Sequence, residues 1–398
     1  MKQLEKLNLR SFLNHKVIHL SASKLLVGIW MVLVVMLFSS CEEQAPNPQD
    51  QAQSILPERF KIDIPESLSN SDSRKNGSFK NAENDTLQGN EIYEFLRVFI
   101  AIAEGASDIT EAIIFSIAAH DIQNVKELNY VSDEDGRIKH LKVNSGVSYD
   151  GRDWEYQLTI SDLESEGNAD GGIGMQVFWN TAPVEGIAIL KPLNINFNDG
   201  EDNGEALFSV EYSEKAMGDY EAHMIVKITD LPVENAEDAQ FACDAIQLFV
   251  GKKGDVVDVY GNSNHPNAKF FTDESGFNWA FVASGLQNKD IAVAEVALPP
   301  STLNSTSREV ILKEYSLKNV FTNQINIWFV ENYGFKPDST DLAGLLKNAD
   351  APGYFNNERF IQGGTAPSDE YGEIENRLNA LTPYNPKDIS ELIIEFLK

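Results

Sequence analysis

Residues 154–160, Trp-Glu-Tyr-Gln-Leu-Thr-Ile, decide the fold class, because apolar and polar side chains alternate along them. The same alternation returns at 220–228, where the apolar positions are Tyr220, Ala222, Met224, Val226 and Ile228. Successive side chains of a strand point to opposite faces of its sheet. A period of two therefore predicts half-buried β-strands at both places.

Further runs of strand type fill the region around these two, at 175–179, 187–190, 206–212, 246–250, 256–260, 277–283, 291–298, 310–312 and 325–330. Turn-forming sequences such as Asp135-Gly136 and Asp150-Gly151 lie between runs and suit tight hairpins. No helical pattern of useful length separates the runs, so consecutive strands are expected to pair antiparallel. We predict a mainly β fold with helices (α+β): a large antiparallel meandering sheet, forming an open barrel or a sandwich.

Two short helices are expected to open this domain, on the concave side of the sheet. Asn90 suits the cap of the first and Gly105 its end, and helical spacing is followed by Ile92, Phe95, Leu96, Phe99 and Ile100. Asp108 and Glu111 resemble a capping box before a second apolar run at 112–119. Apolar residues on nearly all sides indicate helices enclosed by other elements. A membrane hairpin is disfavoured by the charges of Glu94, Arg97, Glu104, Asp108 and Glu111.

An amphipathic helix is expected to close the chain and to dock on the sheet. Asn385 suits its cap and Pro386 its first position, and one apolar stripe is formed by Ile389, Leu392, Ile393, Phe396 and Leu397. The segment before it is punctuated by Pro and Gly. We therefore predict a β-rich domain over 90–335 and an irregular and helical C-terminal segment over 336–398 that packs on it.

The N-terminus has the order of an export signal: five basic residues against one acid in 1–24, then an uncharged apolar run over 25–38. That run is shorter than the roughly 20 apolar residues of a membrane-spanning helix. It ends in Leu37-Phe38-Ser39-Ser40-Cys41, which resembles the lipobox of bacterial type II signal peptides, with Phe38 where that family most often has Leu. The resemblance implies that residues 1–40 are removed and that the Cys41 thiol receives a diacylglycerol. An ordinary secretory signal with an incidental Cys41 is the alternative.

Two or three acyl chains make a stable anchor, since each buried methylene contributes about 0.8 kcal/mol. The resemblance thus implies a protein lipid-anchored in the outer membrane, on either its periplasmic or its surface face. Residues 41–89 are poor in apolar residues and are expected to form a flexible tether. Two features there resemble lipoproteins of the Bacteroidota: Glu42-Glu43 is similar to part of a surface-export signal, and Asp85-Thr86-Leu87 is similar to an O-glycosylation motif, which would make Thr86 the acceptor.

The chain is strongly acidic, with 32 Lys and Arg against 61 Asp and Glu. Residues 1–40 hold five of these basic residues and one acid, which leaves 27 against 60 and a net charge of −33 after cleavage. Such a charge repels nucleic acid, so no nucleic-acid partner is expected. With Cys41 acylated, Cys243 has no disulfide partner in the chain, and its apolar surroundings favour a buried, inert thiol.

Candidate sites for chemistry are few. No cofactor is expected, because the common metal, phosphate, dinucleotide and nucleophile motifs are missing from the sequence. The histidines that follow the signal are widely spaced, at His120, His140, His223 and His265. Residues 198–205 resemble the start of an EF-hand loop, whose calcium ligands would be Asp199, Glu201, Asn203 and Glu205. Val210 stands where that loop needs a bidentate Glu, which favours a plain acidic hairpin loop.

Functions from different classes fit these features. The favoured one is an envelope lipoprotein with a binding or structural role towards a protein, glycan or lipid. Trp154, Trp179, Trp279 and Trp328 would stack on sugars if exposed, although core packing explains strand aromatics better. The second is a hydrolase using carboxylate pairs such as Asp153 with Glu155 or Glu211 with Glu214, pairs that any acidic chain offers. The third is a lipid carrier built on the apolar helices, against which we set a filled core.

Overall fold

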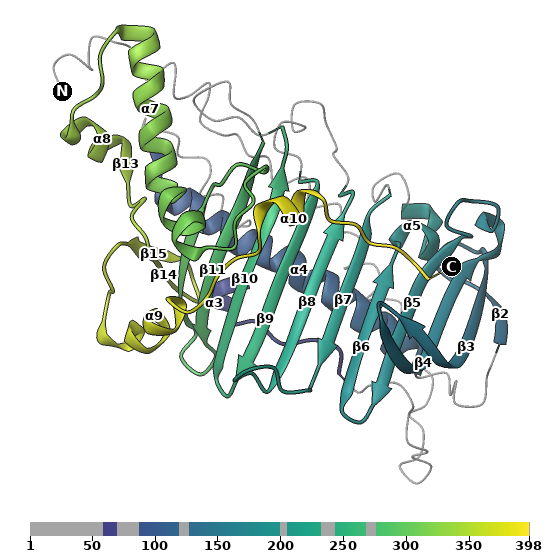
Figure 1. Ribbon diagram of the computed structural model, residues 1–398. Coiled ribbons are helices and arrows are strands. Elements are labelled where there is room, and N and C mark those ends of the chain that lie inside the picture. The colour runs from purple at the N-terminus through teal and green to yellow at the C-terminus, as the bar shows by residue number, and fades with distance from the viewer. Residues whose placement is uncertain are drawn as a thin grey trace. The chain divides into compact units, whose positions relative to one another are not determined.

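A computed structural model describes residues 59–69, 87–118, 127–199, 205–231, 243–267 and 276–397 (Figure 1). The predicted signal, Cys41, Thr86 and His120 lie outside these residues. None of the described helices is long and apolar enough to cross a membrane.

One antiparallel sheet of 13 strands dominates the structure, in the order β15-β14-β12-β11-β10-β9-β8-β7-β6-β5-β4-β3-β2. Its strands are β2 (Glu127–Val131), β3 (Ile138–Tyr149), β4 (Arg152–Asp162), β5 (Ile173–Thr181), β6 (Val184–Leu190), β7 (Leu207–Ser213), β8 (Ala222–Thr229), β9 (Ala245–Lys253), β10 (Val256–His265), β11 (Phe277–Leu286), β12 (Ile291–Ala297), β14 (Gly353–Asn356) and β15 (Phe360–Gly363). The predicted antiparallel meander is confirmed, and among the described strands the sheet is open. Two further short strands, β1 (Leu87–Gln88) and β13 (Leu346–Lys347), pair parallel with each other.

The helical elements are α3 (Glu66–Ser69), α4 (Gly89–Ala118), α5 (Pro192–Ile195), α7 (Leu317–Tyr333), α8 (Ser339–Leu345), α9 (Gly372–Leu378) and α10 (Pro386–Ser390). Short 3-10 turns lie at η4 (Leu163–Ser165), η5 (Phe197–Asp199) and η8 (Asp369–Tyr371), and η7 (Glu309–Glu314) is a π-helix. The two strands predicted at 310–312 and 325–330 are wrong, because η7 and α7 occupy these positions.

The run at 325–330 is too short to separate a helical period from a strand period. The missed signals lie at the ends of α7. The Ser316 hydroxyl accepts a hydrogen bond from the Asn319 amide at the N-cap, and Gly334 ends the helix with a φ of 75°. Between these caps Leu317, Phe321 and Trp328 are buried at helical spacing.

The two helices expected near the N-terminus form one continuous helix, α4. Gly105 lies inside it, because a glycine costs a helix only about 1 kcal/mol and its neighbours Ala103 and Ala106 are buried. Thr110 donates its hydroxyl proton to the Ala106 carbonyl one turn earlier, which keeps this polar side chain compatible with the buried side of the helix.

The predicted closing helix is also shorter than expected. The Asn385 side chain caps α10 and Pro386 occupies its first turn, as predicted, but the helix ends at Ser390. The apolar stripe is not formed, since Ile393 is 73% exposed while Ile394 is buried. Residues 391–397 continue without helical structure.

The chain divides into two compact units. Of the described residues, the first unit holds those within 63–102 and 243–392, and the second holds 59–62, those within 103–231, and 393–397. In the first unit η7 and α9 cover one face of β11 and β12, over a core that includes Val282, Val293 and Ile374. Near the N-terminal end of α4, the Tyr93 ring stacks on Phe360. This ring leaves no room for a side chain at Gly353.

In the second unit, the central strand β5 is buried on both faces over residues 174–179. Phe60 is fully buried against Tyr212 and lies where a side chain at Gly186 would otherwise project. Its amide donates a hydrogen bond to Glu111 of α4, and Lys61 forms an ion pair with Asp108. Phe60, within the predicted tether, therefore packs on the second unit.

Candidate functional site

The chain's last described residues, the C-terminal segment 393–397, lie on the second unit. The sheet side that receives them carries Trp154 of β4, Phe178 of β5, and Ile187 and Ile189 of β6, which form one buried cluster with Ile394. We call this side, together with Gln176 of β5, the tail-binding face. The strand register explains why the β5 and β6 residues lie on one side, because Phe178 pairs with Ile187 and Gln176 with Ile189. Side chains of paired residues lie together on one face.

Gln176 binds the main chain of the segment through both ends of its side-chain amide. Its Nε2 donates to the Leu397 carbonyl at 2.9 Å, and its Oε1 accepts from the Leu397 amide at 2.8 Å. Gln176 is buried between the apolar neighbours Met175 and Val177. Burying an amide without partners costs roughly 1–3 kcal/mol, so these two bonds are what make a glutamine tolerable at this position.

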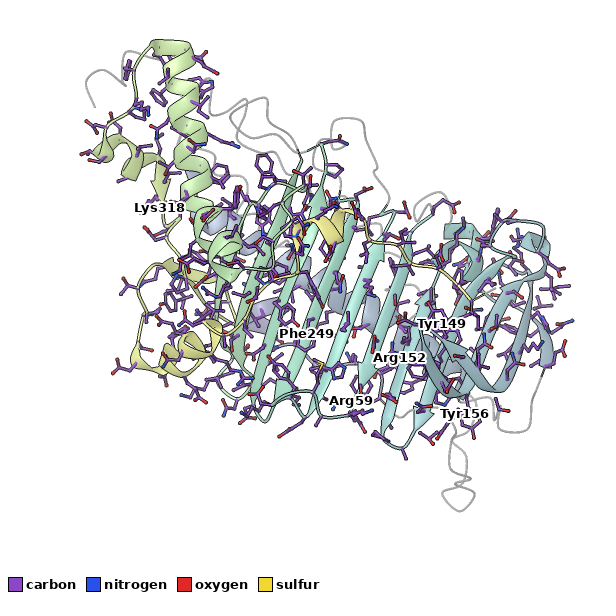
Figure 2. The ribbon with its side chains drawn as sticks, in the orientation of Figure 1. Arg59, Tyr149, Arg152, Tyr156, Phe249 and Lys318 are labelled. Carbon is purple, nitrogen blue, oxygen red and sulfur yellow. The ribbon has the colours of Figure 1, made fainter. Side chains whose placement is uncertain are left out.

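Tyr149 and Arg152 border the tail-binding face, at the hairpin that joins β3 to β4 (Figure 2). The Tyr149 ring stacks on Phe178 with centroids 4.3 Å apart, and its hydroxyl donates to the Glu395 carbonyl at 2.9 Å. Burial, followed by the nearby acids Asp150 and Glu395, raises the pKa of Tyr149, so the phenol stays a donor. Two side chains thus bind main-chain atoms of the segment, and apolar residues hold Ile394.

Arg152 contributes a positive charge at the border of the tail-binding face. Its guanidinium lies 4.9 Å from the centre of the Trp154 ring and binds Glu211 of β7 at 2.6 Å. Burial alone lowers the pKa of Arg152, but the bond to Glu211 and the charges of Glu211 and Asp150 outweigh it and raise the pKa. The guanidinium therefore stays charged and pairs with a carboxylate that the sequence offered as a catalytic candidate.

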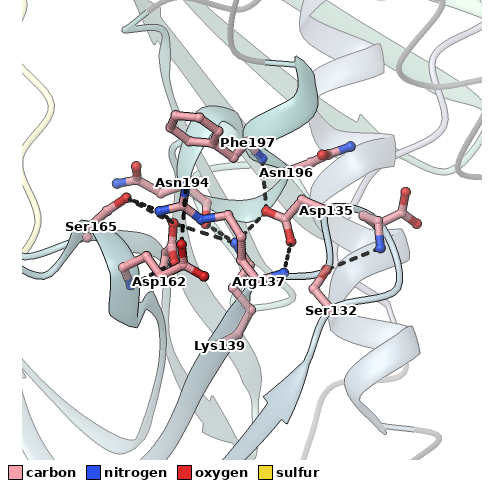
Figure 3. Close-up of polar contacts among 12 residues, drawn as sticks. Ser132, Asp135, Arg137, Lys139, Asp162, Ser165, Asn194, Asn196 and Phe197 are labelled. Carbon is pink, nitrogen blue, oxygen red and sulfur yellow. Dashed lines mark hydrogen bonds and ion pairs between the residues drawn. The ribbon is translucent and has the colours of Figure 1, made fainter.

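A buried ionic network occupies another part of the second unit (Figure 3). Lys139 of β3 has a side chain only 1% exposed, and its ammonium binds Asp135 at 2.8 Å and the Asn194 carbonyl at 3.1 Å. Arg137 binds the fully buried Asp162 at 2.7 Å and lies 4.2 Å from the centre of the Phe197 ring. These contacts join β3 to the end of β4 and to the turns around α5.

Hydrogen bonds set the charge of Asp135 in this network. Burial is the largest single influence and raises its pKa, but the Lys139 hydrogen bond, the amides of Phe197 and Arg137 and the Lys139 charge together lower the pKa below 3.8. Asp135 is therefore ionised at neutral pH. Its charge is matched by Lys139, which makes the network a structural brace with no spare acid or base.

Only part of the calcium candidate loop lies among the described residues. Asp199 ends η5, Glu201 and Asn203 lie outside the described residues, and Glu205 binds Lys191 at 2.5 Å. The Glu205 carboxylate therefore faces a cation. The same Lys191 ammonium also binds Asp170 at 2.7 Å. Among the residues that the structure describes, no three His, Cys, Asp or Glu side chains are grouped to hold a metal ion.

The carboxylate pairs proposed for hydrolysis have other partners. The Glu155 carboxylate accepts hydrogen bonds from the Thr181 amide at 3.0 Å and its hydroxyl at 2.7 Å. Glu211 binds Arg152, and Glu214 accepts from the Tyr212 hydroxyl at 3.1 Å. Three of the four candidate carboxylates thus have hydrogen-bond or ion-pair partners within the second unit.

Other candidate residues that the structure describes lie in the interior or in local pairs. They are three histidines, Cys243 and the tryptophans. His140 binds Glu127 at 2.9 Å, and His265 lies 2.8 Å from the Ser263 hydroxyl in a buried pair beneath Phe99. Burial raises the pKa of the Cys243 thiol, which keeps it protonated as predicted. All four tryptophans offered for sugar stacking are buried, and Trp328 lies in a helix rather than a strand.

Sequence reasoning thus missed the residues that meet on the tail-binding face. The one local signal is Gln176 itself, a polar residue within the apolar run at 175–179. Comparison with protein-family models, with curated proteins and with solved structures gave no match to this chain.

Proposed function

We propose that this chain is an envelope lipoprotein with a binding role, anchored in the outer membrane through acylated Cys41. The observation that carries the binding role is the tail-binding face of the second unit, which holds an extended polypeptide segment through main-chain bonds and one seated apolar residue. Recognition of extended peptides generally combines hydrogen bonds to the peptide main chain with pockets for alternate side chains. Here side chains of the face, those of Gln176 and Tyr149, make the bonds to the main chain.

The hydrolase is the less favoured function, because the carboxylates it would use are bound to Arg152, Thr181 and Tyr212. The sugar-binding variant of the binding role is also weakened, since buried tryptophan rings cannot stack on a sugar. Among a protein, a glycan and a lipid, a protein or peptide is the ligand class that the contacts of the tail-binding face support best.

The anchor is tested by the Cys41→Ser variant of the full chain. We expect the wild type to incorporate labelled fatty acid and to sediment with membranes, because the thiol is the acylation site that the lipobox implies. The variant should incorporate no label and stay uncleaved. A Cys243→Ser variant is the matched control and should be labelled like the wild type, since Cys243 is buried. Equal labelling of Cys41→Ser and the wild type would refute the anchor.

A further inference from the structure

We propose that the tail-binding face is a recognition site for extended peptides of partner proteins, and that the chain's own C-terminal segment 393–397 occupies it as a displaceable internal ligand. This inference rests on the binding role proposed above and names the ligand class. Its carrying observation is the segment itself, which lies in place and shows the chemistry that the face accepts.

The segment is bound through features that many peptides share. Ile394 is buried in the apolar cluster, and Phe396 and Leu397 pack against it, while Ile393 is 73% exposed and Glu395 is exposed. Ile394 and Phe396, two residues apart, therefore face the sheet while Ile393 and Glu395 face away from it, the spacing of an extended strand. The polar bonds go from Gln176 and Tyr149 to main-chain atoms of Leu397 and Glu395, which every peptide has. The ligand class is an extended peptide with apolar side chains at positions i and i+2.

Few hydrogen bonds join the segment to the rest of the fold. The described bonds are the two from Gln176 and the one from Tyr149, and no strand ladder joins 393–397 to the sheet. Neighbouring strands of the sheet, in contrast, pair along their length, as β5 and β6 do over seven residue pairs. A segment with few bonds can open locally while the sheet stays folded.

Competition from the chain's own segment decides how the test must be made. A tethered ligand acts at an effective concentration that reaches millimolar for short tethers, so the face of the wild type is mostly occupied and its apparent affinity for a free peptide is low. Weakening the segment without touching the face should raise that apparent affinity. Ile394→Asp does this, because it places a charge in the apolar cluster.

The experiment uses the full chain and a fluorescent synthetic peptide with the sequence of residues 391–398, followed by fluorescence anisotropy. The wild type should bind it weakly, and Ile394→Asp at least about tenfold more tightly. Ile393→Asp is the matched control one residue away, and should match the wild type because Ile393 points to solvent. Adding Gln176→Ala to Ile394→Asp should remove most of the gain, since it removes both bonds to the peptide's main chain.

One result would overturn the inference: Ile394→Asp, shown to be folded by circular dichroism, binds the peptide no more tightly than the wild type. If Ile394→Asp does not fold, Phe396→Ala gives a milder weakening and should show a smaller gain in the same direction; no gain would contradict the inference. A failure here leaves the fatty-acid labelling of Cys41 unchanged, so the membrane anchor and the peptide site fail separately.

Discussion

Replacing Lys139 by Met is expected to destabilise the second unit by about 3–5 kcal/mol, the usual cost of removing one partner from a buried ion pair. The methionine fills a similar volume but leaves the buried carboxylates of Asp135 and Asp162 without the ammonium that lies 2.8 Å and 3.8 Å from them. Urea denaturation followed by circular dichroism measures this loss. Lys142→Met, an exposed position on the same strand, is the control and should change stability by less than about 0.5 kcal/mol.

The pH dependence of this loss follows from Asp135. Its pKa in the folded chain lies below 3.8, so it contributes stability that is present above that pH and is lost as the pH falls through the folded pKa. Lys139→Met removes the main donor to this carboxylate. The stability difference between wild type and variant should therefore be full at pH 7 and shrink below about pH 4. A difference that stays constant to pH 3 would contradict the assigned role of the pair.

Replacing Arg97 by Ala is expected to destabilise the first unit by a similar amount, about 3–5 kcal/mol. The guanidinium is fully buried and donates to the carbonyls of Glu66, Asn357 and Glu358 at 2.8, 3.0 and 3.3 Å, and to the Glu94 carboxylate at 3.2 Å. Burial lowers the pKa of Arg97, partly offset by Glu94, and alanine leaves these acceptors buried without their donor.

The control for Arg97 is an exposed ion pair of the same unit. Lys318 and Asp350 are each about half exposed, so Lys318→Ala should cost at most about 1 kcal/mol. Thermal and urea unfolding of both variants give the comparison. If Arg97→Ala loses no more stability than Lys318→Ala, then the hydrogen bonds from Arg97 to the carbonyls of residues 357 and 358 contribute little to stability, and the role assigned to Arg97 is wrong.

The sequence predicted the sheet because its signal is local. Alternation at 154–160 and 220–228 lies within single strands, and the short turns between strands make antiparallel pairing the simple outcome. The errors came where local period is ambiguous. The run at 325–330 fits either a strand or a buried helix, and Gly105 suits a helix end unless its neighbours are buried.

The candidate site could not be predicted because it joins residues far apart in the chain. Gln176 binds Leu397 across 221 positions, and neither residue carries a motif. The apolar residues at 389–397 fit a helical period, namely Ile389, Leu392, Ile393, Phe396 and Leu397. Tertiary packing, which the sequence does not display, buries Ile394 instead. The carboxylates were visible in the sequence, but their partners Arg152, Thr181 and Lys191 were not.

The central claim, that the sheet face of the second unit binds an extended segment that can leave it, is tested most directly by amide hydrogen exchange on the wild-type chain. The Leu397 amide, bonded to Gln176, and the amides of β5, bonded within the sheet, report on the two structures separately. We expect the Leu397 amide to be protected relative to an unstructured peptide, yet to exchange at least about a hundredfold faster than the central β5 amides, because the segment opens by local unfolding. Exchange of Leu397 at the rate of β5 would show that the segment leaves only on global unfolding, and would contradict the claim.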